Sequence, residues 1–455
     1  MQRLIFAKIL LMTSSTLLAT QVLAATPRYS TVVSSLYSFN HPYAAQASNE
    51  LATKMTKMAV SPFSFYRGTS HLFYKDMTTL PASSYTNAST NKVWLQGDMH
   101  LQNFGALRDD SANDIFDIND FDEGYFGAYV WDVRRMAVSI LLAAKENGLS
   151  STDRQQLVRD FIDTYLNKNS EFKGTSDELT YRLTTANTTE VVKDTIQALA
   201  GKSRSSFLAK YTAITNSARK FQNLTDLVVV PSATYTAINS AMSSYITSIP
   251  TTKRYSNSYY AVKDIRQKLG SGVGSLGKMR YFVLVQGATT STSDDVILEM
   301  KQQSSSTVAI AAPNLMPTSA YNSNQAYRMV RSAKAMSSNT DRLYGYTVVS
   351  STAYSLREKS PFQEDFDYTL LTSYGKFKTA VEYMGKVLAR AHSMSDQDYD
   401  ATLITYSIDK QITDVVTSRS SFKDEIVNFS VDYATQVEYD WQSLKTAQQN
   451  GATLY

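Results

Sequence analysis

The chain has 455 residues, of which 43% are hydrophobic, so it can bury a sizeable core and general disorder is excluded. It contains no cysteine, which excludes disulfides, thiolate metal sites and a cysteine nucleophile. The 45 basic and 41 acidic residues nearly balance, so the composition indicates neither a nucleic-acid partner nor an anionic membrane surface.

Residues 1–24 have the pattern of a secretory signal peptide. Arg3 and Lys8 precede and enter an apolar run that ends in small residues up to Ala24. An uncleaved membrane anchor is the alternative, but polar residues 13–16 interrupt the run, and a spanning helix needs about 20 apolar residues. We therefore expect cleavage near Ala24, a periplasmic or secreted protein, and no membrane span after cleavage.

The segment "FSFYRGTSHLFYKDM", residues 63–77, is aromatic and basic at once. Arg67 within it can clamp a phosphate through two parallel hydrogen bonds. Stacking of the same guanidinium on Phe65 or Tyr66 is the alternative.

The loop "GDMHLQNFG" follows a short apolar run that predicts a strand. Asp98 and Asn103 are five residues apart, a pair that suits phosphoryl transfer: the carboxylate orients or deprotonates an acceptor hydroxyl and the amide oxygen holds Mg²⁺. An ordinary turn aspartate is the alternative for Asp98. We expect His100 to support the loop by hydrogen bonding rather than to carry protons.

An acidic segment comes next, after a predicted hairpin whose strands flank "DDSAND". Asp117, Asp120, Asp122 and Glu123 repel one another unless a cation lies among them, and hard oxygen ligands favour Mg²⁺ or Mn²⁺. An exposed acidic turn is the alternative. Asp132 then opens a strong helix, where it either caps the helix or braces the preceding loop.

The helical pattern gives way to a β-rich segment, so we divide the mature chain into a helical lobe (25–254), a β-rich lobe (255–360) and a second helical segment (361–455) that completes the large lobe. The β-rich lobe contains a GxGxxG pattern made by Gly272, Gly274 and Gly277. A strand follows it rather than a helix, which favours a flap over nucleotide phosphates instead of a dinucleotide-binding unit.

Lys301 lies on a following apolar strand, which either delivers it to the phosphates or leaves it on the surface. The next helix, "NQAYRMVRSAKAM", offers no carboxylate to pair with Lys301. Glu299 and Glu358 are the alternative partners.

These segments resemble two known families. "GDMHLQN", "NDFDE" and "WD" look like the catalytic loop, metal aspartate and bracing aspartate of the aminoglycoside-phosphotransferase branch of the protein-kinase-like superfamily. Over nearly all of the mature chain the sequence resembles the bacterial family called domain of unknown function 2252. The landmarks of that second resemblance are "FYRGTSHLFYKDM", "GDMHLQNFG", "FDINDFDEGYFGAYVWDVRR", "KLGSGVGSLG" and "LARAHS".

The resemblance implies an α+β, two-lobed kinase-like fold, circularly permuted because the glycine loop follows the catalytic loop in the chain. It implies ATP and Mg²⁺ as cofactors and an unknown hydroxyl-bearing acceptor. Asp98, His100 and Asp132 would be catalytic, Asn103 and Asp120 would bind metal, with Asp117 as a second candidate ligand. The phosphate-binding residues would be Gly272, Gly274, Gly277, Lys301 and Arg67.

Three other activities stay open. The chain could bind nucleotide without turnover, since the usual partner of Lys301 is missing, or it could transfer a nucleoside monophosphate in the same cleft. A metal-dependent phosphoesterase is less favoured, because such sites need more ligands than the four histidines of the chain suggest.

Overall fold

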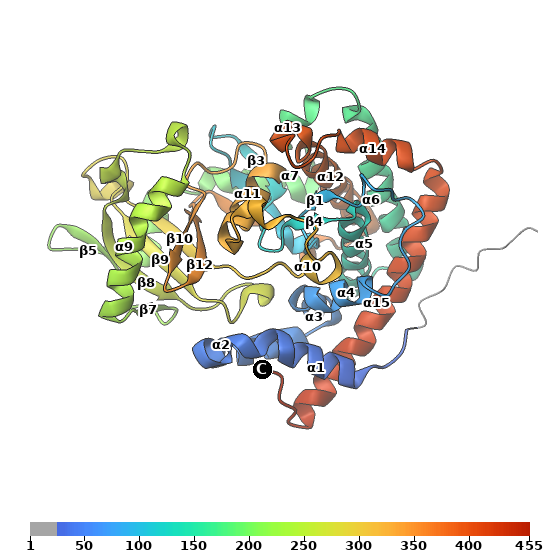
Figure 1. Cartoon of the computed structure of the whole chain (residues 1–455), viewed down its shortest axis with the longest axis horizontal. Helices are drawn as coiled ribbons and strands as arrows, with labels where there is room; N and C mark the ends of the chain where they lie inside the picture. Colours follow the sequence, from blue (N-terminus) through green and yellow to red (C-terminus); the bar gives the residue numbers. More distant parts are fainter. Residues whose placement is uncertain (1–24) are drawn as a thin grey trace, which may run out of the picture.

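The computed structural model describes residues 25–455 as an α+β protein in which a β-rich unit lies beside a larger helical body (Figure 1). The mixed helix and strand content agrees with the predicted class. The expected signal peptide, residues 1–24, lies outside the described residues. Within the described part, no helix is both long enough and apolar enough to cross a bilayer.

A six-stranded antiparallel sheet forms the β-rich unit, with the strand order β11-β12-β10-β9-β8-β7. The strands are β7 (Leu227–Val229), β8 (Val262–Lys268), β9 (Arg280–Val285), β10 (Val296–Gln302), β11 (Gly345–Val349) and β12 (Thr352–Glu358). The chain leaves β10, passes through α11 (Gln325–Met336) and returns to the sheet as β11 and β12. The glycine-rich segment therefore connects two neighbouring strands, β8 and β9, as the sequence predicted.

Other elements of the chain cover both faces of this sheet. Successive side chains of a strand point to opposite faces, so neighbouring residues of one strand belong to different cores. Tyr281 and Val283 of β9 share a core with α9, whereas Phe282 and Leu284 share one with α8 and β6. These covering elements are α8 (Arg204–Tyr211), β5 (Thr212–Thr215), β6 (Ala218–Phe221) and α9 (Ser232–Ser248). The β-rich unit thus includes chain before residue 255, where the sequence had placed its start.

The helical body packs around four long helices and draws on both ends of the chain. Its long helices are α5 (Tyr129–Glu146), α6 (Ser151–Phe172), α12 (Tyr374–Met394) and α15 (Arg419–Gln449). Arg28, just before α1 (Tyr29–Asn40), forms ion pairs of 2.6 Å with Asp76 and with Asp440 of α15. The N-terminal segment is therefore fastened to the C-terminal helix, as Figure 1 shows for α1 and α15.

Two small sheets position the loops between the unit and the body. Strands β1 (Val93–Leu95) and β4 (Tyr125–Gly127) pair, and β2 (Phe104–Arg108) lies between β3 (Asp114–Ile118) and β13 (Gln363–Asp365). The predicted hairpin of β2 and β3 is confirmed. The remaining α-helices are α2 (Ala44–Ala59), α3 (Pro62–Gly68), α4 (Ser70–Met77), α7 (Glu190–Gln197), α10 (Val308–Ala311), α13 (Gln397–Asp400) and α14 (Ile408–Val415).

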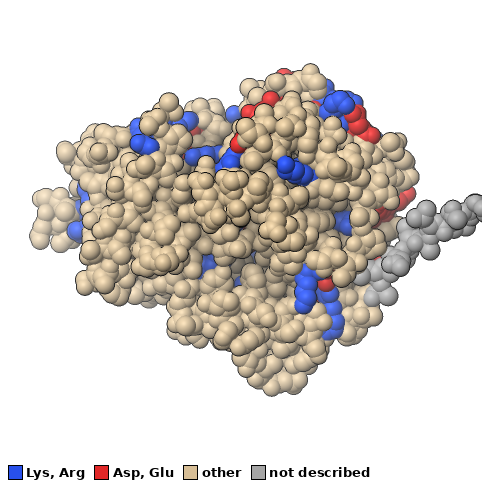
Figure 2. Space-filling model, viewed as in Figure 1, with Lys and Arg blue, Asp and Glu red and all other residues tan. Residues whose placement is uncertain are grey.

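Charged side chains are sparse on the face drawn in Figure 2, where basic and acidic groups lie in small separate clusters. Several charged side chains instead line a cleft where the helical body meets the β-rich unit. This cleft contains the loop between β1 and β2.

Candidate functional site

The loop between β1 and β2 is held by Asp132 in the first turn of α5. The Asp132 carboxylate is fully buried and accepts hydrogen bonds from the backbone N–H groups of Gln96 (2.7 Å) and Gly97 (3.0 Å). It makes no capping bond to α5, whose N-terminal cap is Ala128. Of the two interpretations offered by the sequence, the geometry is that of a brace.

A histidine from the far end of the chain supports the same brace. His392 of α12 places Nε2 3.4 Å from Asp132 Oδ2, and its Nδ1 lies 2.8 Å from the hydroxyl of Tyr165. His392 therefore lies near Gly97, because Asp132 contacts both residues.

Gly97 itself is required by the tight course of the loop. Its φ is +86°, a region that L side chains rarely adopt, and a Cβ there would lie 2.2 Å from the carbonyl oxygen of Glu123. The backbone of the acidic segment therefore lies directly against the loop that carries Asp98.

Asp98 forms an ion pair that the sequence did not predict. Arg135, three residues after Asp132 and fully buried, donates to Asp98 Oδ1 from both Nε (2.8 Å) and Nη2. Burial raises the pKa of Asp98 to about 7, although the charge of Arg135 opposes this. Because Arg135 occupies Oδ1, the oxygen left to meet a ligand is Oδ2. Only the spacing of Asp132 and Arg135, which places them on one helix face, could have indicated this pair.

His100 lies beside Asp98, with Nε2 3.7 Å from Oδ2. Burial, and the charges of Arg67 and Arg135, hold the pKa of His100 well below its usual value, so the ring stays neutral. It also packs edge-on against Phe63, with the ring centroids 6.3 Å apart. The ring supports the loop by packing and not by the hydrogen bonding expected from the sequence, because 3.7 Å exceeds hydrogen-bonding range and Nδ1 is buried without a partner among residues 25–455.

Arg67 reaches the same cavity from α3. Its guanidinium lies 5.9 Å from the ring of Phe63, at the outer limit of a cation–π contact, and not over the rings of Phe65 or Tyr66 that the sequence had offered. Its Nε is buried and has no hydrogen-bond partner in the described part of the chain. A buried, unsatisfied donor of this kind is available to an anion.

The acidic segment after β3 divides its carboxylates between different partners. Asp122 binds Lys301 in a close ion pair and accepts a hydrogen bond of 3.0 Å from Gln303. Burial alone would raise the pKa of Asp122, but Lys301 and Lys278 hold it below its usual value. Asp120 is 3.8 Å from Lys301, and its side chain keeps 38% exposure. Burial and the charge of Asp122 raise the pKa of Asp120.

The partner of Lys301 is therefore Asp122, and neither of the glutamates considered from the sequence. Glu299 binds Arg280 (2.9 Å) and Arg357 (3.3 Å) instead, and Glu358 lies 2.8 Å from Arg204. Helix α11 contributes Arg328, which donates to backbone carbonyls, including that of Asp122 at 2.8 Å.

Asp117, the second candidate metal ligand, lies apart from this group. It is buried and forms a 2.6 Å ion pair with Arg390 of α12. It does not line the cavity that Asp98 and Asp120 share. Of the two candidates, Asp120 is the one whose carboxylate is placed at the cleft.

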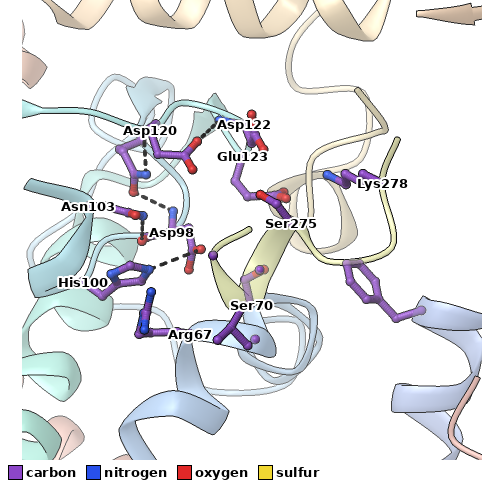
Figure 3. A pocket seen from close by; sticks show the side chains of 16 residues that line it. Arg67, Ser70, Asp98, His100, Asn103, Asp120, Asp122, Glu123, Ser275 and Lys278 are labelled. Carbon is purple, nitrogen blue, oxygen red and sulfur yellow. Dashed lines mark hydrogen bonds and ion pairs between the residues drawn. The ribbon is translucent and has the colours of Figure 1, made fainter. Parts of the chain in front are cut away.

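The glycine loop between β8 and β9 forms one wall of that cavity, whose volume is about 60 Å³. A Cβ on Gly274 would lie 3.4 Å from the Arg67 carbonyl and 3.9 Å from Asp98 Oδ2. Figure 3 shows Asp98, Asn103 and Asp120 on one side, with Ser275 and Lys278 opposite them. The structure thus brings Gly272 and Gly274 to the predicted site, whereas Gly277 (φ +101°) packs against Leu51 of α2.

The oxygen atoms at this cavity fit a magnesium ion. Asn103 donates its amide N–H to the Asp98 carbonyl (2.8 Å), which leaves the Asn103 side-chain oxygen as an acceptor beside Asp120. Magnesium binds proteins through one or two such oxygens and completes its shell with water and phosphate. Within residues 25–455 there is no cluster of three or more His, Asp or Glu side chains arranged to hold a metal by themselves.

Four polar residues that line this cavity were not predicted from the sequence: Ser70, Gln96, Ser275 and Lys278. Ser275 lies within the glycine pattern and Lys278 directly follows it, so their nearness to a phosphate-binding loop was the available signal. Gln96 accepts the backbone N–H of Asp98 (2.8 Å) and donates to the Asp120 carbonyl (2.9 Å). No spacing rule predicts such a link.

The sequence matches a known protein family over most of its length. No curated protein and no solved structure matches the sequence. A family model described as "Uncharacterized protein conserved in bacteria (DUF2252)" matches residues 46–447, a range that contains the loop of Asp98, the acidic segment, the glycine loop and α12. Since this match covers most of its length, the chain belongs to the DUF2252 family.

Proposed function

We propose that the chain is a kinase-like phosphotransferase that moves a phosphoryl group from a Mg²⁺-bound nucleotide, with ATP as the expected donor, to a hydroxyl-bearing acceptor. The observation that carries the proposal is the meeting of Asp98, Asn103, Asp120 and the glycine loop at one cavity. Phosphoryl transfer depends on positioning and on neutralising charge, and these are the groups it needs.

In this proposal Asp98 orients the acceptor hydroxyl through Oδ2 and takes its proton. The acceptor oxygen then bonds to the terminal phosphorus while the bond to the bridging oxygen breaks, and the nucleoside diphosphate leaves. Mg²⁺, when bound by Asn103 and Asp120, would neutralise negative charge on the donor phosphates. Lys301 and the backbone of the glycine loop would hold these phosphates, and Asp132 keeps the loop in place.

The order of elements supports a permuted kinase-like fold. A glycine loop, a strand with Lys301, the helix α11 and two more strands follow one another, as in the nucleotide-binding part of that superfamily. The loop of Asp98 comes earlier in the chain, and α12, after the sheet, packs behind it through His392. Export from the cytoplasm remains an expectation that rests on residues 1–24.

The test is a thermal-shift titration of the purified protein with ATP and Mg²⁺. A ligand at a hundred times its dissociation constant adds about 2.7 kcal/mol of apparent stability. We expect a Mg²⁺-dependent shift that Asp120→Ala abolishes and that Asp177→Ala, at an exposed acid remote from the cavity, preserves. No shift at millimolar ATP, or an equal shift in Asp120→Ala, would contradict the proposed nucleotide site.

A second candidate is a ligand-binding protein without turnover. The pairing of Asp98 with Arg135 and of Lys301 with Asp122 favours it, because both groups are already engaged in the absence of ligand. It predicts nucleotide binding but no release of ADP with any acceptor. Nucleotidyl transfer in the same cleft would release pyrophosphate in place of ADP, so product analysis separates all three.

A further inference from the structure

A second cavity continues from the first beneath the β-rich unit. It has a volume of about 210 Å³ and shares Arg67, Asn103, Asp120, Gly272 and Ser275 with the cavity around Asp98. From there it extends along the inner face of the sheet, the face that carries Lys301. Lys301 lines this second cavity and not the first, so a donor whose phosphates lie at Asp120 and Lys301 would extend into the second cavity.

The apolar part of that inner face is already covered. Phe282 and Leu284 of β9 and Ile297 of β10 are buried in one core. Leu208 and Tyr211 of α8 and Phe221 of β6 are the side chains that cover them. A nucleobase stacks best between apolar surfaces, and here the chain itself occupies the apolar surface of the sheet.

The part of the inner face that stays open is charged. Register places Arg280 opposite Lys301 and Arg357 opposite Glu299, and all four side chains line the cavity. Glu299 is shared between the two arginines. Lys359 also lines the cavity, and its only side-chain hydrogen bond among residues 25–455 is a 3.5 Å contact with Gln363.

Two carboxylates at the outer rim of the second cavity do not neutralise its basic side chains. Glu364 forms a close ion pair with Lys202, and Asp365 is exposed at the end of β13. Arg67 and Lys359 therefore remain cations without a carboxylate within 4 Å in the described part of the chain. Phosphate oxygens would satisfy both.

The volumes of the two connected cavities also favour a ligand that consists mainly of phosphates. Cavities of about 60 and 210 Å³ are each below the roughly 300–1,000 Å³ of sites that enclose drug-sized ligands. A larger cavity of about 340 Å³ lies beyond Arg357, which lines both spaces and donates to the Asn119 carbonyl and the Tyr344 hydroxyl, each at 3.3 Å. Arg357 is thereby held between the two cavities.

We propose that the donor site recognises a phosphoanhydride chain alone and makes no specific contact with a base. Inorganic tripolyphosphate would then bind as well as a nucleoside triphosphate and would serve as donor, with pyrophosphate as the leaving group. The balance of bonds is that of the proposed transfer: one terminal phosphorus–oxygen bond breaks and one to the acceptor oxygen forms. This inference rests on the proposed function and narrows its donor.

The experiment measures dissociation constants by calorimetry for the Mg²⁺ complexes of tripolyphosphate, ATP and CTP, and for adenosine. We expect the three polyphosphates to agree within about threefold and adenosine to show no measurable binding. Lys359→Met, which keeps an unbranched side chain and removes the charge, should weaken all three by at least tenfold. Lys210→Ala, at an exposed lysine of α8, should leave them unchanged.

Each other outcome has a distinct meaning. Tight binding of ATP with tenfold weaker binding of tripolyphosphate or CTP would overturn the base-independent site and leave the proposed function standing. Failure of all three polyphosphates to bind would overturn both. The wild-type panel decides these points by itself, so the result does not depend on how well Lys359→Met folds.

Discussion

Replacing Asp132 with asparagine tests the brace beneath the loop of Asp98. Each oxygen of the buried carboxylate accepts one backbone N–H, from Gln96 and from Gly97. An asparagine side chain keeps one oxygen that accepts a hydrogen bond. Its NH₂ group would face the other backbone N–H, which would then have no acceptor. An unsatisfied buried donor costs about 1–3 kcal/mol, and a lost bond to a charged group is at the upper end, so we expect Asp132→Asn to lower the free energy of unfolding by about 2–4 kcal/mol.

Urea denaturation followed by circular dichroism measures this loss. Asp153→Asn is the matched control, because Asp153 also lies in the first turn of a helix, α6, but among residues 25–455 its side chain pairs only with Ser150. The control reports the helix-dipole contribution, about 0.3–1 kcal/mol. A loss in Asp132→Asn no larger than that of the control would refute the brace and return Asp132 to the role of a simple helix-start acid.

Three further predictions concern buried charges. Asp98→Ala should abolish ADP release and also destabilise the fold by about 3–5 kcal/mol, because Arg135 stays buried without its partner; adding Arg135→Met should recover part of that loss in urea unfolding. Burial lowers the pKa of Lys54 to about 7. The unfolded chain therefore binds an extra proton between pH 7 and about 10.4, so stability should rise with pH in this window and Lys54→Met should flatten the rise in thermal melts. Asp117→Asn should lower stability by about 1–3 kcal/mol, since Arg390 loses its charged partner, yet keep the Mg²⁺-dependent thermal shift; losing the shift would identify Asp117 as a metal ligand.

The expected destabilisation of Asp98→Ala follows from its buried ion pair with Arg135. An exposed loop aspartate can be removed with little effect on folding, and no local pattern in the sequence indicates that Asp98 is one half of a buried ion pair. The structure adds Arg135 as that partner. Asp98→Asn is therefore the better test of catalysis, because it keeps a hydrogen-bond acceptor for Arg135.

Local patterns explain the elements that the sequence predicted well. The β2–β3 hairpin, the helix α5 and the strand after the glycine loop each have a clear apolar periodicity and turn residues at their ends. These signals depend only on neighbours along the chain. Candidate residues that lie on such elements, such as Asp132, were therefore placed on the correct element.

Other features depend on partners distant in sequence. The strands of residues 212–229 were included in a helical segment, because they are only three or four residues long and several of their side chains are exposed. β7 is stabilised by pairing with β8, whereas β5 and β6 pair with each other, and Phe221 and Leu227 pack in one core with Phe282. The partner of Lys301 was missed for the same reason: Asp122 is 179 residues earlier in the chain, and no local spacing connects the two.

Some charged side chains around the cleft are paired with an opposite charge of the protein, and others are not. Asp98 is matched by Arg135 and Asp122 by Lys301, so two of the acidic groups are neutralised by the protein itself. Asp120 keeps the most exposed carboxylate of the group and lies 3.8 Å from the nearest cation. Arg67, across the same cavity, has a buried nitrogen without a partner. A site that leaves one carboxylate and one guanidinium unsatisfied is complementary to a cation and an anion that arrive together, and a magnesium–polyphosphate complex is such a ligand.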